Sequence, residues 1–466
     1  MASITFFSAS EGVTGSMYLI ETDHKRILLE CGLVQGSREE EEQNEAPFPF
    51  DIGSLDAVVL SHAHLDHSGR LPRLVAEGYD GPLLMTLPTI ELLEIMLKDA
   101  ALLQERDVEW DNKRRRRAGK KEIDPLYTEE DAEAALSLCV GIPYNRRQEI
   151  AEGIEIRFRD AGHILGSSIV EFYIHENGVE KKLVFSGDLG NSDTALMPDP
   201  EIVEDADILL LESTYGDRNH RPMTETLEEF EQIIQASRES GGNVLIPSFA
   251  VGRTQEVIFH LGQLYQQGKL DHQAVFLDSP MAIATTEVYH RFQNRFSVED
   301  QAVLRRSRSN SLHAFLPVLR YTQSTQDSMA LNQIAEGAII IAGSGMCNGG
   351  RIRHHLKHNL WRRNAHVIFV GYQAIGTPGR ALVDGVKSIR MAGETIVVNA
   401  RIHTLGGFSA HASQSQLLDW AQHFKQPRPK LLLVHGEEEA KTVLQQAFEK
   451  RNWQANIPHK GERIEF

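Results

Sequence analysis

The sequence is poor in cysteine and has no long apolar run. Only three cysteines occur in 466 residues (Cys31, Cys139 and Cys347), without the paired spacing of metal-binding cysteines, so we expect reduced thiols and no disulfide framework. No apolar stretch approaches the roughly 20 residues that span a bilayer. The first residues also lack the basic and apolar segments of a secretory signal. These absences predict an ordered cytoplasmic protein that does not enter the membrane.

Positive charge is also scarce. The 48 Lys and Arg residues stand against 65 Asp and Glu residues, and the net charge of −17 has the wrong sign for a protein that coats nucleic acid. An enzyme that holds a few phosphates in a metal-lined cleft can still be acidic, because the metal ions carry the local positive charge. One basic run stands out, since seven of the nine residues 113–121 are Lys or Arg. We interpret this run as a solvated loop in preference to an RNA contact.

The length and the pattern of apolar segments predict two domains of α/β type. Short apolar strands separated by turn residues fill the first part of the chain, and one of them, residues 55–60, leads directly into His62. From about residue 214, helical stretches alternate with apolar strands, as in a mainly parallel sheet flanked by helices. We therefore predict a discontinuous first domain at residues 1–213 and 386–466, with a second domain inserted at residues 214–385.

The segment Ser61-His62-Ala63-His64-Leu65-Asp66-His67 holds the strongest signal for chemistry. Its imidazoles and carboxylate suit Zn²⁺ or a similar divalent cation. On a tight loop, His62 and His64 can face one side, while Asp66 and His67 serve a neighbouring position. One ion cannot comfortably use all four groups and keep an open coordination position, so the segment predicts two metal ions.

Three further candidates each lie beside a glycine at the end of a predicted strand: His163, Asp188 and His435. Glycine lets backbone loops approach a shared centre closely. Each residue alone could be an ordinary turn residue, as Asp next to Gly often is. Together they would supply the ligands that the histidine-rich loop lacks for two ions.

In order and context, these residues resemble the ligand set of the metallo-β-lactamase superfamily. The resemblance implies that His62, His64 and His163 hold one zinc ion. It implies that Asp66, His67 and His435 hold a second, with Asp188 bridging the two, although other divalent metals could replace zinc.

Further motifs resemble the β-CASP nucleases, which include the endonuclease subunit of the cleavage and polyadenylation machinery, its archaeal and bacterial relatives, and ribonuclease J. The resemblance covers essentially the whole chain and implies an α/β fold: a metallo-β-lactamase αββα sandwich with an inserted β-CASP domain. The motifs that carry it are Glu212-Ser213-Thr214-Tyr215-Gly216, Phe408-Ser409-Ala410-His411-Ala412 and His435-Gly436-Glu437.

One position departs from the family pattern. The family usually has an Asp before Cys-Gly after the third strand, and this chain has Glu30-Cys31-Gly32. The acidic group remains with one extra methylene, so the sequence leaves open whether Glu30 orients the first metal loop. The long C-terminal extension of ribonuclease J is also missing, which favours endonuclease over 5′-exonuclease action.

The resemblance implies a ribonuclease that hydrolyses RNA phosphodiester bonds with a hydroxide activated by two zinc ions. His411 is then the candidate general acid, and Glu212 would set its tautomer and raise its pKa. In the inserted domain, the glycine-rich turn at Ser344 and Gly345 could present N–H groups to a phosphate, although a simple tight turn fits equally well. Arg253 is a weaker candidate of the same kind.

Two other functions fit parts of the sequence, and the oligomeric state stays open to a homodimer. The same fold could serve a small-molecule ester or thioester hydrolase, because fold and metals host many reactions. The motifs around Glu212 and His411 argue against it, since a small substrate would not need them. A non-catalytic scaffold subunit of an RNA-processing complex is the third reading, and the intact ligand set argues against that one.

Overall fold

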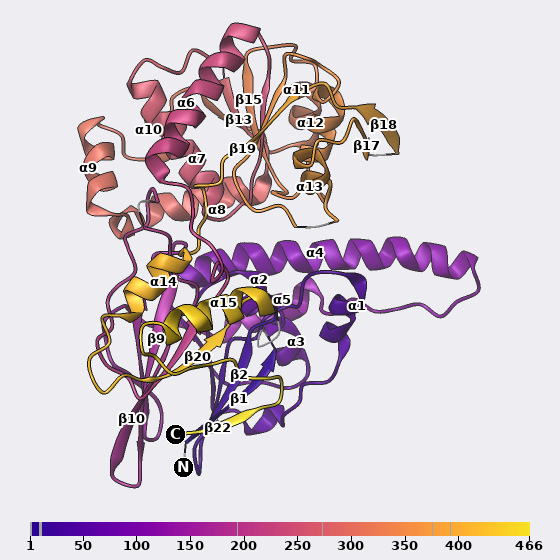
Figure 1. Ribbon diagram of the computed structural model, residues 1–466. Coiled ribbons are helices and arrows are strands. Elements are labelled where there is room, and N and C mark those ends of the chain that lie inside the picture. The colour runs from indigo at the N-terminus through magenta and orange to yellow at the C-terminus, as the bar shows by residue number, and fades with distance from the viewer. Residues whose placement is uncertain (1, 9–11, 193, 273, 375, 392) are drawn as a thin grey trace. The chain divides into compact units, whose positions relative to one another are not determined.

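The computed structural model describes residues 2–8, 12–192, 194–272, 274–374, 376–391 and 393–466, and the chain divides into two compact units (Figure 1). Unit 1 consists of Met1–Ser192, Asp199–Asn219 and His411–Phe466, and unit 2 of Asp193–Pro198 and His220–Ala410. We expected the inserted domain to end at residue 385, but residues 386–410 group with unit 2. The reason is that β19 (Arg401–Thr404) pairs in parallel with β16 (His366–Phe369) of unit 2.

Unit 1 contains two seven-stranded sheets. The strand order of the first sheet is β22 (Arg463–Glu465), β1 (Ser3–Ser8), β2 (Met17–Glu21), β3 (Arg26–Leu29), β4 (Ala57–Val59), β5 (Leu83–Met85) and β6 (Cys139–Gly141). The strand order of the second is β21 (Ala455–Asn456), β20 (Lys430–Val434), β11 (Ile208–Glu212), β10 (Val179–Phe185), β9 (Ser168–Glu176), β8 (Ile154–Asp160) and β7 (Gln148–Ala151).

The two sheets pack face to face, and helices cover their outer faces. Ile27 and Leu29 of β3 share one buried cluster with Phe158 and Phe172 of the second sheet. Leu28 is fully buried although it points the other way, because side chains alternate along a strand. The outer face of the second sheet packs on α14 (Gln414–Ala421) and α15 (Glu438–Glu449). This layering confirms the expected αββα sandwich.

The remaining helices of unit 1 lie in the first half of the chain, between β3 and β6: α1 (Arg38–Glu41), α2 (Leu65–Ser68), α3 (Leu71–Ala76), α4 (Leu87–Arg117) and α5 (Glu129–Ser137). A segment that contains Gly119 and Pro125 separates α4 from α5. The basic run at 113–121 was interpreted as a loop, but most of it forms the last turn of α4. No helix within the described ranges is long and apolar enough to cross a membrane.

Unit 2 is built on a six-stranded parallel sheet, as the alternation of helices and strands predicts. Its order is β14 (Leu319–Tyr321), β13 (Ala274–Leu277), β15 (Ala338–Ala342), β12 (Val244–Pro247), β16 and β19. Strands β17 (Ser388–Met391) and β18 (Glu394–Val397) form a separate hairpin. The helices of the unit are α6 (Met223–Ser240), α7 (Arg253–Gln266), α8 (Pro280–Arg291), α9 (Val298–Arg306), α10 (Leu312–Phe315), α11 (Thr325–Leu331), α12 (Ile352–Asn359) and α13 (Pro378–Val383).

Candidate metal centre

The candidate ligands of unit 1 come from the carboxyl ends of strands in both sheets. The loop that carries His62 follows β4, and Glu30 follows its parallel neighbour β3. In the second sheet, Asp188 follows β10, while His435 follows β20, and the parallel strand β11 lies between these two. Parallel strands end at the same edge of a sheet, so segments far apart in the sequence reach one centre.

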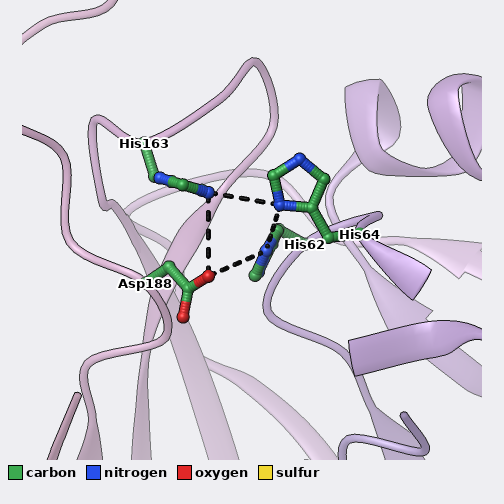
Figure 2. A group of neighbouring side chains, drawn as sticks. All are labelled: His62, His64, His163 and Asp188. Carbon is green, nitrogen blue, oxygen red and sulfur yellow. Dashed lines mark hydrogen bonds and ion pairs between the residues drawn. The ribbon is translucent and has the colours of Figure 1, made fainter. Parts of the chain in front are cut away.

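A first group of ligand atoms surrounds one side of this centre (Figure 2). His64 Nδ1 lies 3.1 Å from His62 Nε2 and 3.2 Å from His163 Nε2. Asp188 Oδ2 lies 3.4 Å from His62 Nε2 and 3.7 Å from His163 Nε2. These four atoms all lie within 4.8 Å of one another, which is compact enough for one metal ion.

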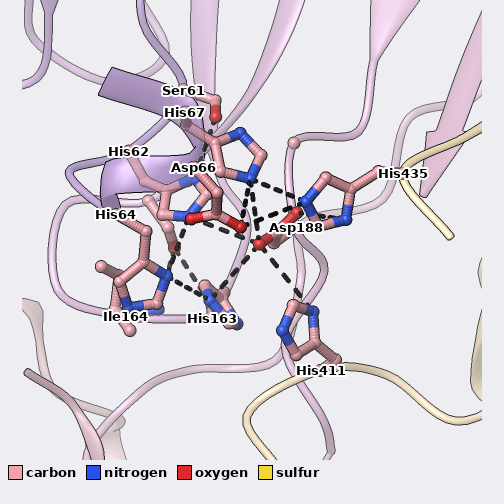
Figure 3. A network of polar contacts seen from close by, with 12 residues as sticks. Ser61, His62, His64, Asp66, His67, His163, Ile164, Asp188, His411 and His435 are labelled. Atoms are coloured by element: carbon pink, nitrogen blue, oxygen red, sulfur yellow. Dashed lines mark hydrogen bonds and ion pairs between the residues drawn. The ribbon is translucent and has the colours of Figure 1, made fainter. Parts of the chain in front are cut away.

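A second group lies beside the first and includes Asp66, His67 and His435 (Figure 3). The Nε2 atoms of His67 and His435 are 3.1 Å apart, and Asp66 Oδ2 lies 3.4 Å from His435 Nε2. Asp188 contacts this group as well, since its Oδ2 is 3.4 Å from His67 Nε2. Asp188 is thus the side chain that the two groups share.

The buried environment of the Asp188 carboxylate is suited to a bound cation. Its carboxylate is 1% exposed, and neither oxygen accepts a hydrogen bond from the described residues. A buried carboxylate without hydrogen bonds is costly unless a positive charge compensates it. The facing imidazole nitrogens have lone pairs suited to Zn²⁺ or a similar ion. The donor set of both groups therefore fits divalent metal ions.

The electrostatics of the first group favour neutral imidazoles, the form that binds metal. Burial, reinforced by neighbouring histidines, lowers the pKa of His62 to about 4 and of His64 to about 3. The pKa of His163 falls well below its usual range for the same reasons, including the charge on His411. For Asp188, burial acts in the opposite direction, but His435 and other histidines hold its pKa well below the usual range.

Glu30 connects the outer side of both groups. This fully buried carboxylate accepts a hydrogen bond from the Ser61 amide (2.6 Å) and another from the Ser61 hydroxyl (2.8 Å). Its Oε2 also contacts His67 Nδ1. Glu30 therefore fixes the histidine-rich loop and leaves His67 Nε2 directed at the centre, despite the additional methylene.

Two hydroxyl groups that the sequence did not single out also contact ring nitrogens. Ser61 Oγ lies 3.0 Å from His62 Nδ1, and Thr214 Oγ1 lies 3.2 Å from His435 Nδ1. Contacts of this kind fix the tautomer and the ring orientation of a metal-binding histidine. The available signal was position, because Ser61 precedes the first histidine and Thr214 belongs to the motif that begins at Glu212.

His411 and Glu212 lie together beside Asp188. His411 Nδ1 is 3.4 Å from Glu212 Oε1 and 3.9 Å from Asp188 Oδ2. Burial alone would lower the pKa of His411, but Glu212 and Asp188 outweigh it and raise the pKa to about 9. Glu212 is fully buried and also accepts hydrogen bonds from the amides of Leu189 and Thr214. The pair thus places a protonated imidazole next to the ligand cluster.

Two glycines allow the backbone of unit 1 to close around this centre. A Cβ on Gly32 would lie 1.7 Å from the carbonyl oxygen of Asp66, and one on Gly190 would lie 2.1 Å from that of Gly162. Side chains at these positions would push apart the segments that carry Asp66 and His163. The glycines next to the motifs are therefore steric requirements of the site.

The other predicted site residues lie in unit 2. The turn of Ser344 and Gly345 follows β15, and its neighbour Phe249 follows the adjacent strand β12. Ser344 Oγ accepts a hydrogen bond from the Gly349 amide (3.3 Å). Arg253 is 7% exposed and pairs with Glu256 of the same helix, so its guanidinium is already engaged. Phosphate binding by these residues stays a prediction.

In this αββα sandwich, the ends of the strands bring histidines together around the shared carboxylate of Asp188. This fold and this site define the class of protein as a metallo-hydrolase. Three known families match the sequence: the metallo-β-lactamase superfamily over residues 11–239, the β-CASP domain over 254–382, and a Zn-dependent metallo-hydrolase RNA specificity domain over 395–458. The chain belongs to the β-CASP family of the metallo-β-lactamase superfamily.

Individual relatives agree with this assignment. A ribonuclease of Thermus thermophilus is 40% identical over 459 residues, which cover 98% of each chain. The transcription termination factor FttA of Methanocaldococcus jannaschii is 31% identical over 444 residues, which cover 93% of this chain and 67% of FttA. The crystal structure of a protein of unknown function from Enterococcus faecalis shares the fold, with a TM-score of 0.56, 13% identity and 99% coverage of both chains.

Proposed function

We propose that this chain is a metal-dependent ribonuclease that cleaves RNA phosphodiester bonds at internal positions. The observation that carries the proposal is the position of Asp188, which contacts both ligand groups and lies 3.9 Å from His411. Support for RNA comes from the named ribonuclease relative, which matches over nearly its whole length, and from the match to an RNA specificity domain.

The proposed site holds two divalent ions, zinc in the first instance. His62, His64 and His163 would hold one ion and Asp66, His67 and His435 the other, with Asp188 contacting both. Two bound ions would supply an activated water and positive charge for the phosphate oxygens. Glu30, Ser61 and Thr214 keep the imidazoles in the orientation that this arrangement needs.

His411 is the proposed proton donor to the leaving oxygen. Its Nδ1 faces Glu212 and Asp188, and these carboxylates favour the protonated ring. A donor that is protonated near neutral pH can release its proton as negative charge develops on the leaving group. Glu212 is a positioning residue in this scheme, because it holds the ring of His411 and does not itself reach the substrate.

We also propose a reducing, cytoplasmic location. The support is that Cys31, Cys139 and Cys347 are all free thiols, and that Cys31 and Cys347 are buried. Whether the protein is a homodimer can be measured by light scattering.

The proposal is tested with a long single-stranded RNA labelled at its 5′ end, incubated with the full chain and Zn²⁺. We expect a ladder of internal products with the wild type and none with Asp66→Ala. The matched control is Asp80→Ala, since Asp80 is an exposed aspartate outside the ligand groups. Release of labelled mononucleotide as the first product would replace endonuclease by 5′-exonuclease action. Intact RNA in the presence of metal would refute the proposed substrate.

A further inference from the structure

The second half of α4 has little support from the rest of unit 1. The buried residues of this 31-residue helix end at Ala101. Beyond that point, large apolar side chains are exposed, with Leu103 at 51% and Trp110 at 56%. Figure 1 shows this part of α4 reaching outward, with the following segment returning beside it. Asn112 and Arg115 hold the helix end to the returning segment through the backbone of Ile123 and Lys121. The exposed apolar side chains remain available to a partner.

The charge of this helix end is opposite to that of the whole chain. Seven of the nine residues 113–121 are cationic in a chain with a net charge of −17. Lys113 pairs with Glu109 at 2.7 Å, Arg114 with Asp111 at 3.6 Å and Arg116 with Glu122 at 3.3 Å. Among the described residues, no acidic side chain pairs with Arg117, Lys120 or Lys121. A substantial part of this positive charge is therefore open to an outside anion.

Stabilisation of the helix does not account for so many cations. One or two positive side chains in the last turn favour the helix dipole by less than about 1 kcal/mol. Additional like charges at spacings of three or four residues repel each other, as Lys113 and Arg117 do. A polyanion would relieve this repulsion and release its own counterions. The pattern fits a phosphate backbone better than a structural role.

We propose that the basic segment formed by the end of α4 and the residues after it, 110–121, binds the backbone of an RNA strand at a distance from the metal centre. This inference rests on the proposed ribonuclease function. The cations would contact phosphates, and the exposed ring of Trp110, one helical turn before Arg114, offers a surface on which a base can stack. The site acts by holding long substrates and takes no part in the cleavage step.

The position of α4 relative to the centre sets the RNA length that this site needs. At its start, the hydroxyls of Thr86 and Thr89 donate to the carbonyl of Gly166 at 2.8 and 2.9 Å, three residues after the candidate ligand His163. From Thr89 to Arg117 the helix rises about 42 Å, at roughly 1.5 Å per residue. A stacked strand covers that distance with about 12 nucleotides. Shorter RNA could occupy the centre without reaching the basic end.

The test compares full-length variants on two single-stranded oligouridylates, of about 8 and about 40 nucleotides, with Zn²⁺. The test variant carries Arg114→Gln, Arg117→Gln, Lys120→Gln and Lys121→Gln, because glutamine preserves helix propensity. The control carries Lys425→Gln, Lys430→Gln, Lys450→Gln and Lys460→Gln, which removes the same charge from exposed lysines elsewhere in unit 1. A variant with only Arg114→Lys and Arg117→Lys retains the charge. Binding is measured by fluorescence anisotropy in an Asp66→Ala background, and cleavage as kcat/KM.

We expect the test variant to lose roughly tenfold in affinity for the long RNA, with a salt slope lower by up to about 3, and to treat the short RNA as the wild type does. The control and the charge-retaining variant should behave as the wild type. Equal losses on both RNAs, or no loss on the long one, would overturn the inference. A change in mass by light scattering without a length-dependent loss would also overturn it, in favour of a second copy of the chain. If neither RNA is cleaved but the binding difference persists, the proposed function fails and this site stands.

Discussion

Glu30 offers a sharp test of how the site is held, because one carboxylate serves both Ser61 and His67. Its Oε1 accepts from the Ser61 amide, and its Oε2 accepts from the Ser61 hydroxyl and contacts His67 Nδ1. Glu30→Gln keeps the shape of the side chain but turns one oxygen into a donor. If the amide nitrogen faces His67, the ring must move its proton to Nε2, the atom directed at the metal centre. If the amide nitrogen of the new side chain instead faces the backbone N–H of Ser61, two hydrogen-bond donors face each other and that hydrogen bond is lost.

The size of the effect follows from the bond that is lost. A hydrogen bond to a charged group contributes about 1.5–3 kcal/mol, and each 1.4 kcal/mol is a factor of about ten in affinity. We therefore expect the metal ion held by Asp66, His67 and His435 to bind about 10- to 100-fold more weakly, as is typical for outer partners of metal ligands. The ion held with His163 should be affected less.

The assay is a zinc titration against a competing chelator, with the bound metal counted by elemental analysis. The matched control is Glu171→Gln, because Glu171 is equally buried but pairs with Arg157 and Lys182, away from the ligand groups. Glu30→Gln should weaken one of two zinc equivalents, and Glu171→Gln neither. Two unchanged equivalents in a folded Glu30→Gln protein would refute the orienting role of Glu30.

Three other perturbations test separate parts of the reasoning. His411→Ala should keep both metal equivalents and lower kcat by about 10²- to 10⁴-fold; unchanged turnover would remove His411 from the mechanism. Gly32→Ala should lower both thermal stability and metal content, because its Cβ would lie 1.7 Å from the Asp66 carbonyl, whereas Gly406→Ala meets no atom within 4 Å and should change neither. Burial opposes ionisation of Glu171, but Arg157 and Lys182 hold its pKa at about 2. A carboxylate whose pKa is lowered in the folded state stabilises the fold above its ordinary pKa of about 4.3. We therefore expect the free energy of unfolding of the wild type to exceed that of Glu171→Gln by up to about 3 kcal/mol at neutral pH. In urea unfolding, this difference should disappear as the pH falls from about 4 to about 2. A pH-independent difference would contradict this assignment.

The candidate ligands could be picked out from the sequence because their signals are local, and the structure brings these residues together. A strand that ends in a histidine or aspartate next to glycine can be read without knowing the fold, as at Asp188 and His435. An Asn-Gly pair is likewise a local signal for a hairpin turn, and Asn177 and Gly178 both have positive φ between β9 and β10. Bringing such strand ends together then follows from parallel pairing. Local patterns therefore predicted the sandwich, and they selected the residues that meet at its strand ends.

Predictions that depended on distant partners were weaker. The end of the inserted domain was placed before the hairpin of β17 and β18, because nothing local shows that β19 returns to pair with β16. The contact of Thr214 with His435 depends on packing across 221 residues. Arg253 is different, since its partner Glu256 lies three residues later in the same helix. That spacing could have identified an ion pair from the sequence alone.

The outer hydrogen bonds connect the two ligand groups through Glu30 and Ser61. The Ser61 hydroxyl donates to Glu30, so its lone pairs remain for the Nδ1–H of His62, and His62 then offers Nε2 to the centre. Glu30 acts on His67 directly, and so a single carboxylate orients one imidazole in each group. Asp188 joins the same two groups from the inner side. Glu30 acts directly on His67 and reaches His62 only through Ser61, so we expect its replacement to weaken mainly the ion held by Asp66, His67 and His435. A change at Thr214 acts on His435 alone.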